Sequence, residues 1–219
     1  MVWSLIRRRR ADARRPVPDA CTPGRHALST PRLLFYAPVT QLDALAAIAT
    51  GADPEAQRWQ GNQADQVVPD ADIRRSLLRM RPADATRLLT NPELAEPFEP
   101  GPEMPELLVC VRRDTGRYAG CLELDHDRGE IGGNLAPDHR GQGLGAELFL
   151  AGALWAHGHV GLPTVRAGTA TANVACRRAL ERAGFVPAPG PPRHTLPDGR
   201  ELDSVWFQHE GAVSTCARA

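Results

Sequence analysis

Three glycines at alternate positions, Gly141, Gly143 and Gly145, stand where an apolar, strand-like segment gives way to a helical pattern. The first turn of a helix presents unpaired backbone N–H groups and the positive end of the helix dipole. Glycine lets a ligand approach such a backbone closely. The stretch Leu135-Ala-Pro-Asp-His-Arg-Gly-Gln-Gly-Leu-Gly-Ala-Glu147 therefore predicts a cradle for a pyrophosphate group.

Two rival interpretations fit the same turn less well. Gly141-x-Gly143-x-x-Ala146 fits a permissive dinucleotide fingerprint, which expects a βαβ unit and an acidic residue about 20 positions further on, at the end of the next strand. The strand expected at residues 164–170 contains no acid, and hairpins precede the loop. A purely structural turn needs fewer than three glycines, so the cradle is the favoured interpretation.

Acidic side chains occupy the two strands before the cradle. With residues 126–129 as a turn, Asp125 faces Glu130, Glu123 faces Gly132 and Cys121 faces Asn134. Alternation along the strands then gathers the polar residues Cys121, Glu123, Asp125, Glu130 and Asn134 on one side, and Leu122, Leu124, Ile131 and Leu135 on the other. Such a polar stripe either faces solvent or lines a site.

The first half of the chain predicts a strand and several helices. Thr40 is a plausible N-cap and Gly51 a stop, and Pro54 stands at the first position of the next helix. The expected elements are a strand at 33–36, helices at 41–50 and 53–59, one or two helices within 69–95 broken near Pro82 and Pro92, and a proline-rich loop at 96–105.

The second half predicts a meander followed by alternating helices and strands. Asp114-Thr-Gly116 is a hairpin turn signal across which Cys110 and Cys121 would pair, and Asn173 caps a helix that ends at Gly184. The expected strands are 106–112, 117–125, 130–136, 164–170, a short one at 185–186, and 202–208, with a loop at 187–200 and a helix at 143–158. Because that helix makes a crossover, strands 130–136 and 164–170 should run parallel.

With these elements in place, the chain resembles the GNAT N-acetyltransferase superfamily. Arg140-Gly-Gln-Gly143-Leu-Gly145 matches the family's Arg/Gln-x-x-Gly-x-Gly/Ala signature, and the Asn173 helix ending in Gly184-Phe185 matches its second landmark. Asp53-Pro-Glu…Arg58-Trp59 and Gly129-Glu-Ile-Gly-Gly133 are similar to the ribosomal-protein N-terminal (Rim-type) acetyltransferase branch. The resemblance covers roughly residues 31–208.

The resemblance implies an α/β fold of three layers, α/β/α, with a mixed, mostly antiparallel central sheet of six or seven strands. This domain would span residues 31–210, after a disordered basic tail with a proline-rich linker at 1–30 and before a flexible tail at 211–219. The implied reaction is acetyl transfer from acetyl-CoA to a primary amine, with a protein or peptide N-terminus as acceptor. A small-molecule amine such as an aminoglycoside or polyamine is the alternative acceptor, and a non-catalytic acyl-CoA-binding module is the alternative class.

The resemblance also implies how the donor is held. The backbone of Gly133 and Leu135 would pair with the pantetheine arm as an added strand would. Asn173 would orient the pantetheine end, would be a plain helix cap, or would do both. The pyrophosphate would be held by backbone N–H groups of Arg140, Gly141, Gln142, Gly143, Leu144 and Gly145.

Direct attack on a thioester requires a neutral amine. An α-amino group titrates near ~8 and a lysine near ~10.4, so deprotonation at pH 7 costs about 1.4 kcal/mol for the first and about 4.6 kcal/mol for the second. One carboxylate acting through water therefore suffices for an N-terminal amine. Glu130 is the preferred base because it matches the acidic position of the resembled branch, and Glu123 is second. Asp125 opposite Glu130 would raise the proton affinity of one of them.

The proton for the leaving thiolate is harder to assign. Many GNAT enzymes have a Tyr seven residues after the capping Asn, where this chain has Leu180. The Rim-type branch often has Ser three residues after the Asn, where this chain has Cys176, a poorer donor that also fits a small buried helix residue. Solvent is the other source of the proton. His194, before the last strand, is a candidate for reaching the acceptor.

Composition limits the other functions. The 219 residues carry a formal net charge of zero and no Lys, so nothing in the total charge favours nucleic acid. Arg7–Arg10 leave a nucleic-acid or membrane-surface arm as the alternative to a disordered tail. Five cysteines without C-x-x-C spacing argue against a metal site or a disulfide framework and favour a cytoplasmic location. No apolar run reaches the roughly 18–20 residues that span a bilayer, and a monomer or homodimer is expected.

Overall fold

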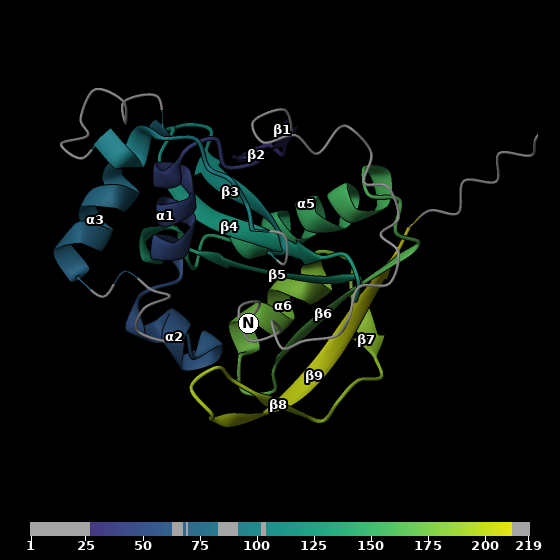
Figure 1. Ribbon diagram of the computed structural model, residues 1–219. Helices are drawn as coiled ribbons and strands as arrows, with labels where there is room; N and C mark the ends of the chain where they lie inside the picture. The colour runs from purple at the N-terminus through teal and green to yellow at the C-terminus, as the bar shows by residue number, and fades with distance from the viewer. Residues whose placement is uncertain (1–26, 63–67, 69, 83–91, 102–103, 212–219) are drawn as a thin grey trace, which may run out of the picture.

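The computed structural model describes residues 27–62, 68, 70–82, 92–101 and 104–211 as a central sheet with helices on both faces (Figure 1). The sheet order is β1-β2-β3-β4-β5-β6-β9-β7, and β8 pairs with β9. The strands are β1 (Ala27–Ser29), β2 (Leu33–Tyr36), β3 (Glu106–Arg112), β4 (Tyr118–Asp125), β5 (Glu130–Leu135), β6 (Thr164–Ala170), β7 (Val186–Ala188), β8 (Arg193–Thr195) and β9 (Glu201–Glu210). The helices are α1 (Gln41–Thr50), α2 (Pro54–Gln60), α3 (Ala71–Arg79), α5 (Leu144–Gly158) and α6 (Val174–Arg182), with short 3-10 turns η3 (Pro92–Ala95) and η4 (Pro137–His139).

Strands β1 to β5 form an antiparallel meander, and the β4–β5 register agrees with the sequence prediction. Asp125 pairs with Glu130, Glu123 with Gly132 and Cys121 with Asn134. The hairpin at 126–129 therefore places the acidic side chains on one face, as predicted. One detail differs: Cys110 faces Gly120 and Cys121 faces Val109, so the two cysteines are not opposite one another.

Strands β5 and β6 run parallel, as the crossover predicts, but they pair at one position only, Glu130 with Arg166. Beyond that pair the two strands part, one towards Leu135 and the other towards Ala170. Strand β6 is instead paired along its whole length with β9, from Thr164 opposite Glu210 to Ala170 opposite Ser204.

The two faces of the sheet carry different helices. Leu122, Leu124 and Ile131 pack with Leu144 and Leu148 of α5 in the main core, which also includes residues of α6. Cys121, on the opposite side of β4, packs with Ala46 and Ala47 of α1, and α3 packs against α1. The three-layer α/β/α fold is therefore confirmed.

Helix α1 begins and ends where the sequence predicts. The Thr40 side chain accepts the N–H of Asp43, and Gly51 ends the helix. Asp43 is buried and accepts hydrogen bonds from the hydroxyls of Tyr36 at 2.9 Å and Tyr118 at 2.8 Å. Burial and this carboxylate raise the pKa of both phenols.

Two expectations need correction. The described residues form nine strands rather than six or seven, because β1 and β8 have three residues each and are too short to produce a periodic pattern. The expected domain boundary at residue 31 is late, since Ala27–Ser29 already pair with β2. Of the tails expected at 1–30 and 211–219, residues 1–26 and 212–219 lie outside the described residues. None of the helices described is long and apolar enough to cross a membrane.

Candidate active site

The glycine-rich turn has an open backbone at the start of α5. Gly141 and Gly143 adopt positive φ angles of 73° and 75°, and Gly143 is the N-cap of the helix. A Cβ atom added at Gly141 would meet nothing within 4 Å, and one at Gly143 would meet only Arg32 Nη2 at 3.9 Å. The space above these two residues is therefore free for a ligand, and the residues present fit a pyrophosphate.

Gly145 has a different reason to be glycine. A Cβ atom there would lie 3.1 Å from the Cβ of Ala179 on α6. The absence of a side chain lets the cradle helix and the Asn173 helix approach one another. Packing between α5 and α6 therefore explains Gly145.

Arg140 faces the protein rather than the cradle. Its backbone N–H donates to Pro137 O at 3.2 Å. Its Nε donates to Leu135 O at 2.8 Å, and its Nη1 donates to Asp53 Oδ1 at 2.9 Å. The N–H of Arg140, expected to hold pyrophosphate, is thus already occupied, whereas no hydrogen bond within the described part of the chain takes those of Gly141, Gln142 and Gly143.

The Arg140–Asp53 ion pair connects the end of β5 to the start of α2. Asp53 is the N-cap of α2, and its side chain accepts the N–H groups of Glu55 and Ala56. Burial alone would raise the pKa of Asp53, but the hydrogen bonds and charge of Arg140 outweigh it and hold that pKa below its usual value.

Gln142 and Glu147 fix the outer side of the cradle. The Gln142 side chain donates to Asp138 O at 2.8 Å and accepts from Arg112 Nη1 at 3.1 Å. The backbone carbonyl of Gln142 accepts from Arg32 Nη1 at 2.8 Å. Glu147 accepts the backbone N–H of Arg32 at 2.7 Å and its Nε at 2.8 Å. The segment before β2 thus supports the turn from outside.

The edge of β5 exposes the groups expected to meet the pantetheine. Ala136 N–H donates to Ala119 O, which turns the even-numbered residues of β5 towards β4. Gly133 and Leu135 therefore direct their backbone groups to the side where β6 parts from β5. The Leu135 carbonyl is occupied by Arg140, but its N–H lies on this edge.

The start of α6 carries Asn173 as a helix cap. Its Oδ1 accepts the N–H of Cys176 at 3.1 Å, so the capping role is present. Burial raises the pKa of Cys176, more than a hydrogen bond from Thr169 lowers it, so this thiol stays protonated at neutral pH. Leu180 is fully buried in the core. Both tyrosines of the chain are bound to Asp43, so neither can replace the missing Tyr.

The two candidate bases lie on the α1 face of the sheet. Glu130 pairs with Asp125 and is half-buried; burial raises its pKa, Arg128 opposes this shift and Asp125 adds to it. Burial also raises the pKa of Glu123. Both carboxyls are therefore shifted towards the proton affinity that a general base needs near neutral pH.

A line of hydrogen bonds runs to Glu123 from α1. Thr50 Oγ1 donates to Asn134 Oδ1 at 2.5 Å, Asn134 Nδ2 donates to Cys121 Sγ at 3.1 Å, and Cys121 Sγ lies 3.9 Å from Glu123 Oε1. Burial raises the pKa of Cys121 to about 12, so its thiol donates to the carboxylate. Three residues of the polar stripe, Cys121, Glu123 and Asn134, are thus joined by contacts within the protein.

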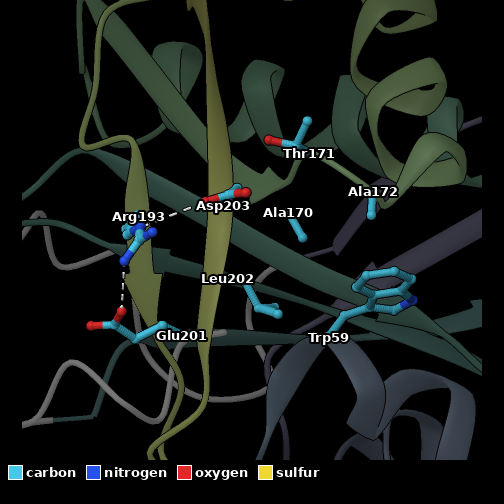
Figure 2. A pocket seen from close by; sticks show the side chains of 8 residues that line it. All are labelled: Trp59, Ala170, Thr171, Ala172, Arg193, Glu201, Leu202 and Asp203. Carbon is cyan, nitrogen blue, oxygen red and sulfur yellow. Dashed lines mark hydrogen bonds and ion pairs between the residues drawn. The ribbon is translucent and has the colours of Figure 1, made fainter.

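A pocket of about 610 Å³ opens beyond the end of β6, on the side of α2 (Figure 2). One wall is Trp59 of α2, another is the turn that leads into Asn173, and the third is the start of β9 with its neighbour on β8. The lining residues are Trp59, Ala170, Thr171, Ala172, Arg193, Glu201, Leu202 and Asp203. Arg193 lies 3.2 Å from Glu201 and 3.6 Å from Asp203, which leaves this wall with one net negative charge.

Most of this pocket could not be predicted from the sequence. Trp59 belongs to a Rim-type motif that implies no role for it, and Pro197-Asp-Gly199 is a readable turn signal before Glu201. His194 is not among the lining residues; its side chain is half-buried on β8. Glu123 and Glu130 also lie outside the lining.

The chain matches the acetyltransferase (GNAT) domain family over residues 32–186. No curated protein sequence matches it. Among solved structures, it is similar to an acetyltransferase from Agrobacterium tumefaciens str. C58, with 19% identity, a TM-score of 0.54, and coverage of 92% of this chain and 99% of that one.

Two further solved structures have the same fold. The ribosomal-protein-S5-alanine acetyltransferase from Vibrio fischeri has 12% identity and a TM-score of 0.56, covering 84% of this chain and 96% of that one. A GNAT-family acetyltransferase from Bacillus anthracis has 14% identity and a TM-score of 0.56, covering 84% and 98%. At these identities the likeness shows the fold.

The family match spans the cradle, the crossover helix and the Asn173 helix, and the fold agrees with it throughout. Acetyl-CoA is the donor that GNAT acetyltransferases use, and the open turn at Gly141 and Gly143 suits its pyrophosphate. The chain belongs to the GNAT family and is an acyl-CoA-dependent N-acetyltransferase.

Proposed function

We propose that this enzyme transfers the acetyl group of acetyl-CoA to the N-terminal α-amine of a protein or peptide. The observation that carries the proposal is the pocket at Ala170–Ala172, which adjoins Asn173 and lies on the α2 side. The cradle opens at the N-terminus of α5, and α5 covers the other face of the sheet. In this proposal the acetyl group would reach the acceptor side where β5 and β6 part.

The donor residues follow from the open backbone groups. The N–H groups of Gly141, Gln142, Gly143 and Leu144 bind the pyrophosphate, with the adjoining N–H of Gly145. Gly133 and Leu135 pair with the pantetheine along the free edge of β5. Asn173 keeps its cap through Oδ1 and turns its Nδ2 to the donor.

Glu130 serves as the base, with Glu123 second. The carboxylate accepts a proton from the ammonium group through water, and the neutral amine attacks the thioester carbonyl. The attacking nitrogen then releases its second proton to water as the carbon–sulfur bond breaks, which leaves a neutral amide. The leaving thiolate takes its proton from solvent or from Cys176. Leu180 gives no donor at the position where many relatives have Tyr.

The acceptor class follows from the strength of these bases. A carboxyl with a raised pKa can remove a proton from an α-ammonium group, because the pKa of that group lies only about one unit above pH 7. Deprotonation of a lysine or polyamine ammonium group at pH 7 costs about 3 kcal/mol more than that of an α-ammonium group. The catalytic groups therefore suit a peptide N-terminus.

A small cationic amine is the second candidate. The pocket joins an indole, Trp59, to two carboxylates, Glu201 and Asp203, and this combination binds ammonium groups. In that case the pocket would bind a second ammonium group of a polyamine or aminoglycoside, one that is not acetylated.

The test is CoA release with a panel of acceptors. Peptides with free N-termini should be turned over, the same peptides with blocked N-termini should be inactive, and spermidine and an aminoglycoside should react weakly. Faster turnover of the small amines would favour the second candidate. Silence with every acceptor, together with thermal stabilisation by acetyl-CoA, would identify a non-catalytic acyl-CoA-binding module.

A further inference from the structure

Two of the pocket's three walls come from distant parts of the chain. Trp59 belongs to α2, whereas Glu201, Leu202 and Asp203 begin β9 (Figure 2). Their separation along the chain exceeds one hundred residues, so the shape of the pocket depends on what holds α2 against the β8–β9 hairpin.

Arg200 makes that connection. Its Nη2 donates to Gln57 O at 2.9 Å and its Nη1 donates to Arg58 O at 3.2 Å. These are carbonyls of the last turn of α2, where partners are scarce and the helix dipole is negative. Trp59 directly follows Arg58, and Glu201 directly follows Arg200, so the contact lies next to both walls.

The hairpin presents Arg200 in a fixed position. Asp198 accepts the Arg200 N–H at 3.0 Å and its Nε at 2.7 Å. Leu196 N–H donates to Arg200 O at 2.7 Å, and Gly199 closes the turn with a φ of 86°. The guanidinium fork is therefore oriented before it meets α2.

The backbone contact beneath Arg200 is equally close. Gly61 ends α2 with a φ of 61°, and a Cβ atom there would lie 2.8 Å from Leu196 Cβ and 2.9 Å from Asp198 Cγ. Leu196 is 2% exposed. The hairpin thus packs on the helix end, and Arg200 sets the angle between them.

We propose that Arg200 is a positioning residue for the acceptor: it joins Trp59 to Glu201–Asp203 and thereby sets how tightly the amine substrate binds. This inference rests on the proposed acceptor role of the pocket. Arg200 contacts neither the cradle nor the candidate bases, so the inference separates acceptor binding from donor binding and from chemistry.

The experiment measures acceptor KM, kcat and acetyl-CoA Kd for Arg200→Ala, Arg200→Lys and the milder Asp198→Asn, with Arg182→Ala as control. Arg182 is an exposed arginine on α6 away from the pocket. Losing two charge-assisted hydrogen bonds at a half-exposed site should raise the acceptor KM about fivefold or more. The lysine variant should lie between Ala and wild type, and kcat and acetyl-CoA Kd should stay within about twofold.

Unchanged KM in Arg200→Ala, or an equal loss of acetyl-CoA affinity, would overturn the inference. If wild-type enzyme acetylates none of the acceptors, the proposed function fails instead. Arg200 is then tested by hydrogen exchange: faster exchange at 57–61 in Arg200→Ala, but not in Arg182→Ala, supports the connection, and unchanged exchange overturns it.

Discussion

At the scale of single residues, the groups that we propose for proton transfer are carboxyls and a thiol rather than a phenol. Tyr36 and Tyr118 both donate to Asp43, which fixes them in the α1 layer. Leu180 fills the core at the position where relatives often have Tyr. The pH dependence of this enzyme should therefore be governed on its acid side by a buried carboxyl.

The variant Glu130→Gln tests whether Glu130 is the carboxyl that governs the acid side of the pH–rate profile. Burial raises the pKa of Glu130, so the active, ionised form is lost as the pH falls through a value above 4.5, the ordinary carboxyl value. The variant should lower kcat about 100-fold or more and remove the acid limb of the pH–rate profile, while acetyl-CoA Kd is unchanged.

Glu123→Gln is the matched control, because burial raises the pKa of that carboxyl too. If Glu123→Gln removes the acid limb and Glu130→Gln leaves it intact, Glu123 is the base. Unchanged kinetics in both variants would exclude the two carboxyls from the mechanism.

At the scale of elements, the start of α5 combines positive φ angles with empty space. Gly143→Glu should place a carboxylate where a pyrophosphate binds, so thermal stabilisation by acetyl-CoA should disappear. Gly161 provides the control, since it has a φ of 77° and nothing within 4 Å of an added Cβ. Gly161→Glu carries the same backbone strain, about 1–2 kcal/mol, and should keep the acetyl-CoA response. Equal responses in the two variants would contradict the cradle.

Much of this element arrangement could be predicted from local sequence. Thr40 and Gly51 mark the ends of α1 because capping is decided within a few residues. The turn at 126–129 sets the β4–β5 register, because a hairpin leaves little freedom once its turn is known.

The remaining features depend on contacts between distant segments. The sequence offers no means of pairing Asp53 with Arg140 or Arg200 with the end of α2, because these partners are separated by 87 and by 142–143 positions. The spacing of the motif assigns Gly145 to the cradle, whereas its contact with Ala179 is a matter of helix packing.

At the scale of the whole molecule, an ion pair connects the cradle with helix α2. Arg140 follows η4 in the loop after β5, and Asp53 begins α2, whose Trp59 lines the pocket. The side chains of Asp53 and Arg140 are only 14% and 31% exposed, so solvent screens this pair less than a surface pair.

Asp53→Asn measures this connection, because asparagine retains the helix cap but loses the charge. We expect a loss of about 1–2 kcal/mol in the free energy of unfolding at pH 7. The native pKa of Asp53 lies below its ordinary 3.8, so the contribution is complete above pH 3.8 and is lost as the pH falls further. In urea unfolding, the difference in free energy of unfolding between wild type and Asp53→Asn should shrink as the pH is lowered from 7 to 3.

Asp70→Asn is the control for the cap. Asp70 caps α3 by accepting the N–H groups of Asp72 and Ile73, on the exposed surface. Its replacement should change unfolding much less than that of Asp53. If both variants lose the same free energy of unfolding, or if the loss in Asp53→Asn does not depend on pH, the ion pair contributes nothing beyond capping.

Strands β5 and β6 pair at a single position, and we propose that the pantetheine arm of acetyl-CoA pairs with the remaining edge of β5. A ligand that binds only the native protein shifts the folding equilibrium by mass action, by about 2.7 kcal/mol when its concentration is a hundred times its Kd. Acetyl-CoA acting as the missing strand would thus protect the chain from proteolysis in proportion to its supply. We therefore expect the abundance of this enzyme in a cell to rise and fall with the concentration of acetyl-CoA, which its own reaction consumes.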